Sequence, residues 1–118
     1  MSKSKPIDAL LPLPAAMFHM LLALGEGERH GYALKREILQ RTAGKMNLGS
    51  GALYGSINKM LEQGLIEESD ERPDSHLDDE RRRYYRITTL GRKVAQAEAS
   101  RMRELVRLAD DRLGLAHG

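Results

Sequence analysis

Residues 49–66 read GSGALYGSINKMLEQGLI, and this stretch decides what kind of fold the chain can form. Its apolar side chains recur every three or four residues, which is the spacing of one face of an α-helix. The buried stripe that this spacing predicts consists of Leu53, Ile57, Met60 and Leu61. Ser50 is expected to cap the start of the helix, and Gly64 is expected to follow its last turn.

The opposite face of this helix carries small, hydroxyl, amide and cationic side chains, with no acidic residue before Glu62. Small residues allow a helix to approach a DNA groove, asparagine can pair with adenine, and hydroxyl groups can bond phosphates or base edges. The N-terminus of a helix also favours phosphate. The DNA-binding positions expected on this helix are therefore Ser50, Ala52, Tyr54, Ser56, Asn58 and Lys59.

Each of these residues also has an ordinary structural explanation. Tyr54 can be a half-buried packing residue, and Gly55 can simply weaken the helix by ~1 kcal/mol relative to alanine. Asn58 and Lys59 are residue types that many solvated helices carry. Their combination on a third helix, ahead of a basic strand, is what favours DNA as the partner.

Two further helices are predicted before this stretch. Apolar residues recur at helical spacing through residues 13–24, with prolines at the start and Gly25 at the end, which predicts a mostly buried first helix. Leu34 and Ile38 are four residues apart among charged neighbours, which predicts a short amphipathic helix that ends at residues 42–44.

A β-hairpin is predicted after the third helix. Residues 65–69 are too few for another helix, and residues 82–88 are rich in Tyr, Ile and Thr, which favour strands. Alternation places Tyr85 and Ile87 on the inner face together with Arg83, whose guanidinium is expected to meet Glu67 or Glu68. The outward positions, which are the DNA contacts expected from the hairpin, are Arg82, Tyr84 and Arg86.

The charge of the chain is unevenly distributed along the sequence. Residues 67–80 contain eight acidic residues and one arginine, whereas residues 81–107 contain nine basic and two acidic residues, although the whole chain has a net charge of only +2. Phosphate would repel the acidic loop of the hairpin, so the loop is not expected to lie deep in a DNA groove unless Arg72 and His76 face it.

A long C-terminal helix is predicted from Thr88 or Thr89 to about Leu113, because no proline interrupts the helical spacing of its apolar residues. At 1.5 Å per residue it is roughly 35 Å long, so its distal half should extend beyond its own domain. The apolar stripe expected to dimerise consists of Met102, Leu105, Val106, Ala109 and Leu113.

Three helices followed by a two-stranded hairpin describe a winged helix-turn-helix, a mainly α fold with a small β-wing. The chain also resembles the PadR family of bacterial winged-helix transcriptional regulators. The motifs that carry this resemblance are HGYALKREI (residues 30–38), SGALYGSINKMLEQGLI (50–66) and DERRRYYRITTLGR (79–92). We expect a DNA-binding domain over residues 1–88 and a dimerisation helix over residues 89–118.

The resemblance implies a homodimeric repressor that binds double-stranded DNA at a palindromic operator, with the third helix in the major groove and the wings on the flanking backbone. It also implies that the first helix joins the dimer interface, where we place Met17 and Leu21. By position, Gly51 and Tyr54 match the family's Gly and Tyr on the third helix, so Gly51 is also an expected DNA contact. The wing-strand motif of the family matches Arg83, Tyr84 and Tyr85.

The chain departs from the family pattern at the start of the third helix. Ser50 and Gly55 stand where family members commonly carry proline, so this helix start is expected to be less rigid. The single C-terminal helix resembles the short subfamily, whose members sense small-molecule effectors, often at the dimer interface. Some members bind flat aromatic drugs there through Trp, but this chain has no Trp and one Phe.

Composition narrows the remaining functional classes. The 118 residues suit one domain, 41% of them are hydrophobic, and no apolar run reaches the ~20 residues of a membrane span. The N-terminal residues are expected to form the first helix rather than a signal peptide. Because the chain has no cysteine, disulfides and thiolate metal sites are excluded, which fits a cytoplasmic location.

The sequence contains no pattern that predicts catalysis, a cofactor or a metal site. His76 lies among several acidic residues, but their spacing lacks the order and the glycine of a calcium loop. We therefore expect a DNA-binding regulator and no enzyme. Two alternatives stay open, namely a winged-helix protein-interaction module and a ligand-binding dimer with weak DNA affinity.

Overall fold

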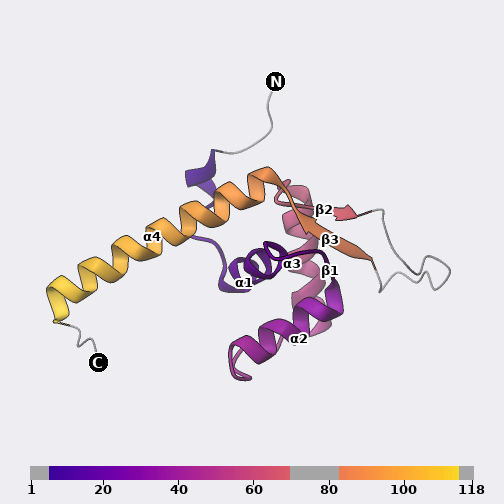
Figure 1. Cartoon of the computed structure of the whole chain (residues 1–118), viewed down its shortest axis with the longest axis horizontal. Coiled ribbons are helices and arrows are strands. Elements are labelled where there is room, and N and C mark those ends of the chain that lie inside the picture. Colours follow the sequence, from indigo (N-terminus) through magenta and orange to yellow (C-terminus); the bar gives the residue numbers. More distant parts are fainter. Residues whose placement is uncertain (1–5, 70–82, 115–118) are drawn as a thin grey trace.

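A computed structural model describes residues 6–69 and 83–114 of the chain. It contains four α-helices, one short 3-10 helix and a small antiparallel sheet (Figure 1). In chain order the elements are η1 (Ile7–Leu10), α1 (Ala15–Leu24), β1 (Arg29–His30), α2 (Gly31–Arg41), α3 (Ser50–Glu62), β2 (Ile66–Ser69), β3 (Tyr84–Ile87) and α4 (Thr89–Leu113). The predicted winged helix-turn-helix with a long C-terminal helix is confirmed.

The core lies where α1, α2 and α3 meet, under the sheet and the first turns of α4. The apolar stripe of α3 behaves as predicted, because Leu53, Ile57 and Met60 are buried and Leu61 lies half-buried at its edge. The fully buried side chains that α1 and α2 contribute to the same cluster include Met20, Leu21, Leu24, Leu34 and Ile38.

The two ends of α3 differ in how well the sequence predicts them. The prediction that Ser50 caps the helix is wrong, because the carbonyl of Gly49 already accepts from the N–H of Leu53 and makes Gly49 the cap. The prediction for Gly64 is confirmed. Its φ of 76° lies in the left-handed region, and the N–H of Leu65 closes the helix end on the carbonyl of Met60 at 2.9 Å.

The sheet has three strands in the order β1-β3-β2, one more than the predicted hairpin. β1 is a two-residue strand in which Arg29 pairs with Tyr85 and His30 pairs with Tyr84. Such a short strand has no periodicity of its own and exists only through this pairing. The hairpin of β2 and β3 is confirmed, whereas Arg82, Arg72 and His76 lie outside the described residues.

The start of α4 is tied to the end of α3. Of the two predicted starting residues, Thr88 is the one that caps α4: its hydroxyl oxygen accepts from the N–H of Gly91 at 3.0 Å. The same hydroxyl donates to the carbonyl of Gly64 at 2.6 Å, and the N–H of Thr88 donates to the carbonyl of Leu65 at 3.0 Å. Gly91 packs so closely on this turn that a Cβ there would overlap the Leu65 carbonyl oxygen.

A buried carboxylate ties α4 to the N-terminal segment. Glu98 is fully buried, and its oxygens accept from the Arg101 guanidinium at 2.7 and 3.0 Å and from the N–H of Leu13 at 3.2 Å. The bond from Arg101 lowers the pKa of Glu98 below its ordinary value, against the opposing effect of burial. In Figure 1, α4 runs between η1 and α1 and then extends past the other described elements.

This lowered pKa predicts how the stability of the fold depends on pH. A carboxylate whose pKa is lower in the folded state stabilises the fold above its unfolded pKa, and that contribution is lost as pH falls through its folded pKa. We therefore expect Glu98→Gln to lower the thermal midpoint at pH 7 and to flatten the acidic part of the midpoint-against-pH curve.

Thermal unfolding between pH 7 and pH 2 would check this expectation. Glu104→Gln is the matched control, because Glu104 forms an exposed pair with Arg107 on the same helix. If the thermal midpoint falls equally steeply at acidic pH in the wild type and in the Glu98 variant, the role given to Glu98 is contradicted.

Candidate nucleic-acid interface

The outward face of α3 is open and lined by small and polar residues. Gly51, Gly55, Asn58 and Lys59 are all exposed, and a Cβ built on either glycine would meet nothing within 4 Å. Ser50 and Ala52 are also exposed, and Ser56 is half-buried at the flank. The structure thus brings most of the DNA-binding positions predicted on α3 to one solvent-facing surface.

Tyr54 faces a neighbouring helix instead of projecting from this surface. The residue is half-buried, and its ring lies against Gly31, where an added Cβ would lie 2.9 Å from the hydroxyl oxygen and 3.0 Å from Cε1. It also lies near Tyr85: burial raises the pKa of the Tyr85 hydroxyl, and Glu68 and Tyr54 act in the same direction. Tyr54 therefore helps to fix α3 against α2 and the sheet.

His30 organises the junction between β1 and α2. Its Nδ1 accepts from the N–H of Ala33 at 3.2 Å, so its side chain caps α2. Its ring meets the ring of Tyr84 edge to face, with centroids 5.4 Å apart. Tyr84 is therefore half-buried against β1, although the hairpin pattern alone predicts it as an outward residue.

The arginines of the described wing are held by carboxylates. Arg83 meets Glu68 at 3.0 Å, which agrees with the predicted pairing. Arg86, expected to contact phosphate, instead has its Nε 2.8 Å from Glu67 and its Nη1 3.8 Å from Glu28. Glu67 lies directly opposite Arg86 in the β2–β3 register. The charge of Arg86 is thus largely balanced within the protein.

The distal half of α4 leaves its apolar stripe in solvent. Leu105 is 50% exposed, Val106 62% and Leu113 74%, whereas Ala109 is half-buried. Met102 and Leu108 are exposed as well. The predicted contact residues on α1, Met17 and Leu21, are instead buried in the chain's own core, and the large apolar side chain that α1 exposes is Leu22.

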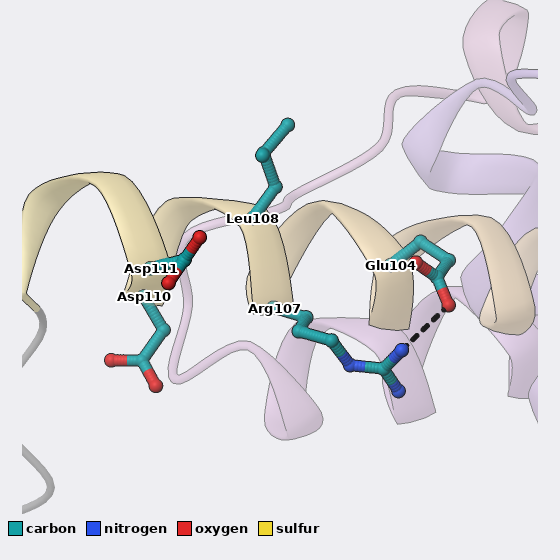
Figure 2. A pocket seen from close by; sticks show the side chains of 5 residues that line it. All are labelled: Glu104, Arg107, Leu108, Asp110 and Asp111. Atoms are coloured by element: carbon teal, nitrogen blue, oxygen red, sulfur yellow. Dashed lines mark hydrogen bonds and ion pairs between the residues drawn. The ribbon is translucent and has the colours of Figure 1, made fainter.

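The described residues offer little else for chemistry. No group of three or more His, Asp or Glu residues among them could hold a metal ion. The recess in Figure 2 is lined by five side chains of α4 alone, including Glu104 paired with Arg107, so it is a shallow surface rather than an enclosed site. Within the described ranges, no helix is both long and apolar enough to cross a membrane.

Comparison with known proteins adds to this geometry. Residues 20–97 match the model of the transcriptional regulator PadR-like family, a range that runs from α1 through the first turns of α4. The chain belongs to the PadR-like family. The resemblance deduced from the three sequence motifs is thereby confirmed, and the chain is placed among transcriptional regulators.

Solved structures show that other chains share the fold. A PadR family transcription regulator from Clostridium difficile superposes with a TM-score of 0.70 at 18% identity, covering 85% of this chain and 99% of the other. RosR from H. salinarum gives 0.63 at 25% identity, covering 90% and 99%.

A curated relative has a similar sequence over part of its length. It is an uncharacterized 37.1 kDa protein in a transposon of Streptomyces fradiae, 31% identical over 90 residues that make up 76% of this chain. The chain spans about a quarter of the length of that relative, because the match covers 24% of it.

Proposed function

We propose that this PadR-like protein is a homodimeric repressor that binds an operator with the outward face of α3. The observation that carries the proposal is the open surface of Gly51, Gly55, Asn58 and Lys59, held in place by a buried stripe on the other side of the same helix. A helix without bulky or acidic side chains on one face suits the major groove.

Dimerisation is the second part of the proposal. Residues 1–88 would form the DNA-binding unit and residues 89–118 the dimerisation helix. The exposed stripe of α4 continues the face that Val94 and Glu98 bury against the domain, so a second copy would extend an existing apolar contact. On α1, the exposed Leu22 is a better candidate for the interface than Met17 or Leu21, which are already buried.

The resemblance to the short subfamily supports a further step. In this proposal, a small molecule binds between the two copies and releases the repressor from DNA. Calorimetric titration with hydrophobic effectors, with and without DNA, would test it. Heat in both titrations, together with weaker DNA binding, is the expected result, and DNA affinity that stays constant at saturating effector would contradict release.

Fluorescence anisotropy with labelled duplexes from the region upstream of the protein's own gene would test DNA binding itself. We expect sequence-dependent binding that weakens as salt rises, because phosphate contacts displace counterions. Absence of such binding at micromolar dimer would instead favour a protein-interaction module, which the internally paired arginines of the wing would also suit.

Asn58 and Lys59 should affect this binding in different ways. Both are exposed on α3, but an amide can form two hydrogen bonds to adenine, whereas an ammonium group contacts phosphate as a point charge. We expect Asn58→Ala to lose ~1–3 kcal/mol of discrimination at one base pair, and Lys59→Ala to weaken binding to all sequences. Titration of single-base operator variants would separate the two effects, and an equal loss at every variant would exclude base recognition by Asn58.

A further inference from the structure

Three residues of α2 form a cluster in which Tyr32 and Arg36 are exposed and Lys35 is half-buried. Tyr32 is 55% exposed, with Nζ of Lys35 5.9 Å and Cζ of Arg36 5.7 Å from the centroid of its ring. The spacing of three and four residues places all three side chains together, on a face turned away from the buried Leu34 and Ile38. An aromatic ring in this position holds two cationic groups close together.

The cations of this cluster differ from those of the wing in their pairing. In the described ranges, Lys35 and Arg36 form no ion pair, whereas Arg83 and Arg86 each meet at least one glutamate. In the sequence, the residues that join the two wing strands, 70–83, contain six acidic residues and four arginines. The positive charge available to a polyanion therefore lies on α2 more than on the described wing.

The first residue of α2, directly before Tyr32 of this cluster, packs against α3. The ring of Tyr54 on α3 packs against Gly31, and Tyr32 is the next residue along α2. The start of α2 therefore lies at the side of α3 that carries Tyr54, one helical turn before Asn58. In a helix-turn-helix, the helix that precedes the DNA-reading helix crosses the phosphate backbone.

We infer that Tyr32, Lys35 and Arg36 form a phosphate-binding surface that holds the DNA backbone beside α3 and carries the backbone contacts that the sequence assigns to the wing. This inference rests on the proposed function. Arginine and lysine bind phosphate oxygens, and the tyrosine hydroxyl can donate to the same group. Phosphate at Lys35 or Arg36 would displace no carboxylate of the described residues. Phosphate at Arg86 would compete with Glu67 and Glu28.

The experiment measures the affinity of the full chain for its upstream duplex and for a scrambled duplex across a salt series. We expect Lys35→Ala/Arg36→Ala to weaken both by at least ~10-fold and to reduce the slope of log affinity against log salt by roughly two. Lys93→Ala/Arg103→Ala removes the same charge from exposed positions of α4 and should leave the slope unchanged.

Two additional variants make the outcomes decisive. Lys35→Arg/Arg36→Lys keeps both charges and should retain the slope, which separates a charge effect from a folding defect. If the wild type binds DNA but the α2 alanine variant keeps its affinity, or if Arg83→Ala/Arg86→Ala alone lowers the slope, the inference is overturned while the proposed function stands. If the wild type binds neither duplex, the proposed function itself fails.

Discussion

Replacing Gly91 with alanine is expected to destabilise the fold by about 3 kcal/mol or more, at the upper end of what overpacking costs. The added Cβ would overlap the carbonyl oxygen of Leu65 and lie 2.9 Å from Cγ1 of Ile87. A backbone carbonyl cannot turn away as a flexible side chain can, and this one also accepts from the N–H of Thr88. The variant must therefore move α4 or lose this contact.

Chemical denaturation followed by circular dichroism would measure the loss. Gly55→Ala is the matched control, because a Cβ at this helical glycine meets nothing within 4 Å. Alanine favours a helix over glycine by up to ~1 kcal/mol, so the control should be as stable as the wild type or slightly more so. Equal stability of the Gly91 variant and the wild type would show that α4 can move away from Leu65 at little cost.

Placing a charge at Val106 is expected to abolish the proposed dimer. Val106 is 62% exposed in the single chain, so glutamate should not disturb the monomer fold. In a two-fold interface both copies carry the substitution, and both carboxylates would lose water. A cost of about 2 to 4 kcal/mol would raise the dissociation constant roughly 30- to 1000-fold.

Sedimentation velocity over a range of protein concentrations would measure this effect. Gln96→Glu introduces the same charge at an exposed position of α4, outside the apolar stripe, and should remain dimeric. An intact dimer for Val106→Glu would place the interface elsewhere, whereas monomers from both variants would point to general repulsion along α4. Binding to the operator should fall together with dimerisation, because in the proposed dimer each copy would read one half-site.

Local signals explain why so much of the fold follows from the sequence. The α3 stripe, the glycine after its last turn and the threonine before α4 each depend on neighbours within four residues, which periodicity and capping rules describe. Gly64 was predictable for this reason, and the start of α4 was predictable to within the two threonines Thr88 and Thr89. Ser50 was not, because the sequence offers two adjacent positions and only the backbone decides between them.

Features that depend on distant residues could not be predicted in the same way. β1 exists because β3 is present to pair with it, and Glu98 is buried only because Leu13 and Arg101 satisfy its oxygens. Arg86 looks like a phosphate contact until Glu28, far away in the sequence, is placed beside it. The sequence was sufficient to predict which face of α3 forms the candidate site. The contacts that orient this face join residues distant in the sequence, so they could be identified only in the folded structure.

The hydrogen bonds of Thr88 mean that α4 begins without a flexible linker. Since Thr88 is anchored to Gly64 and Leu65, the direction of α4 is set by the last turn of α3. In a dimer joined through the far end of α4, the length and tilt of this helix would determine the separation of the two α3 helices. Insertions or deletions in α4 beyond Arg101 would change the length of this helix. In such a dimer they would therefore change the preferred spacing between operator half-sites without replacing any residue of the proposed DNA-binding surface.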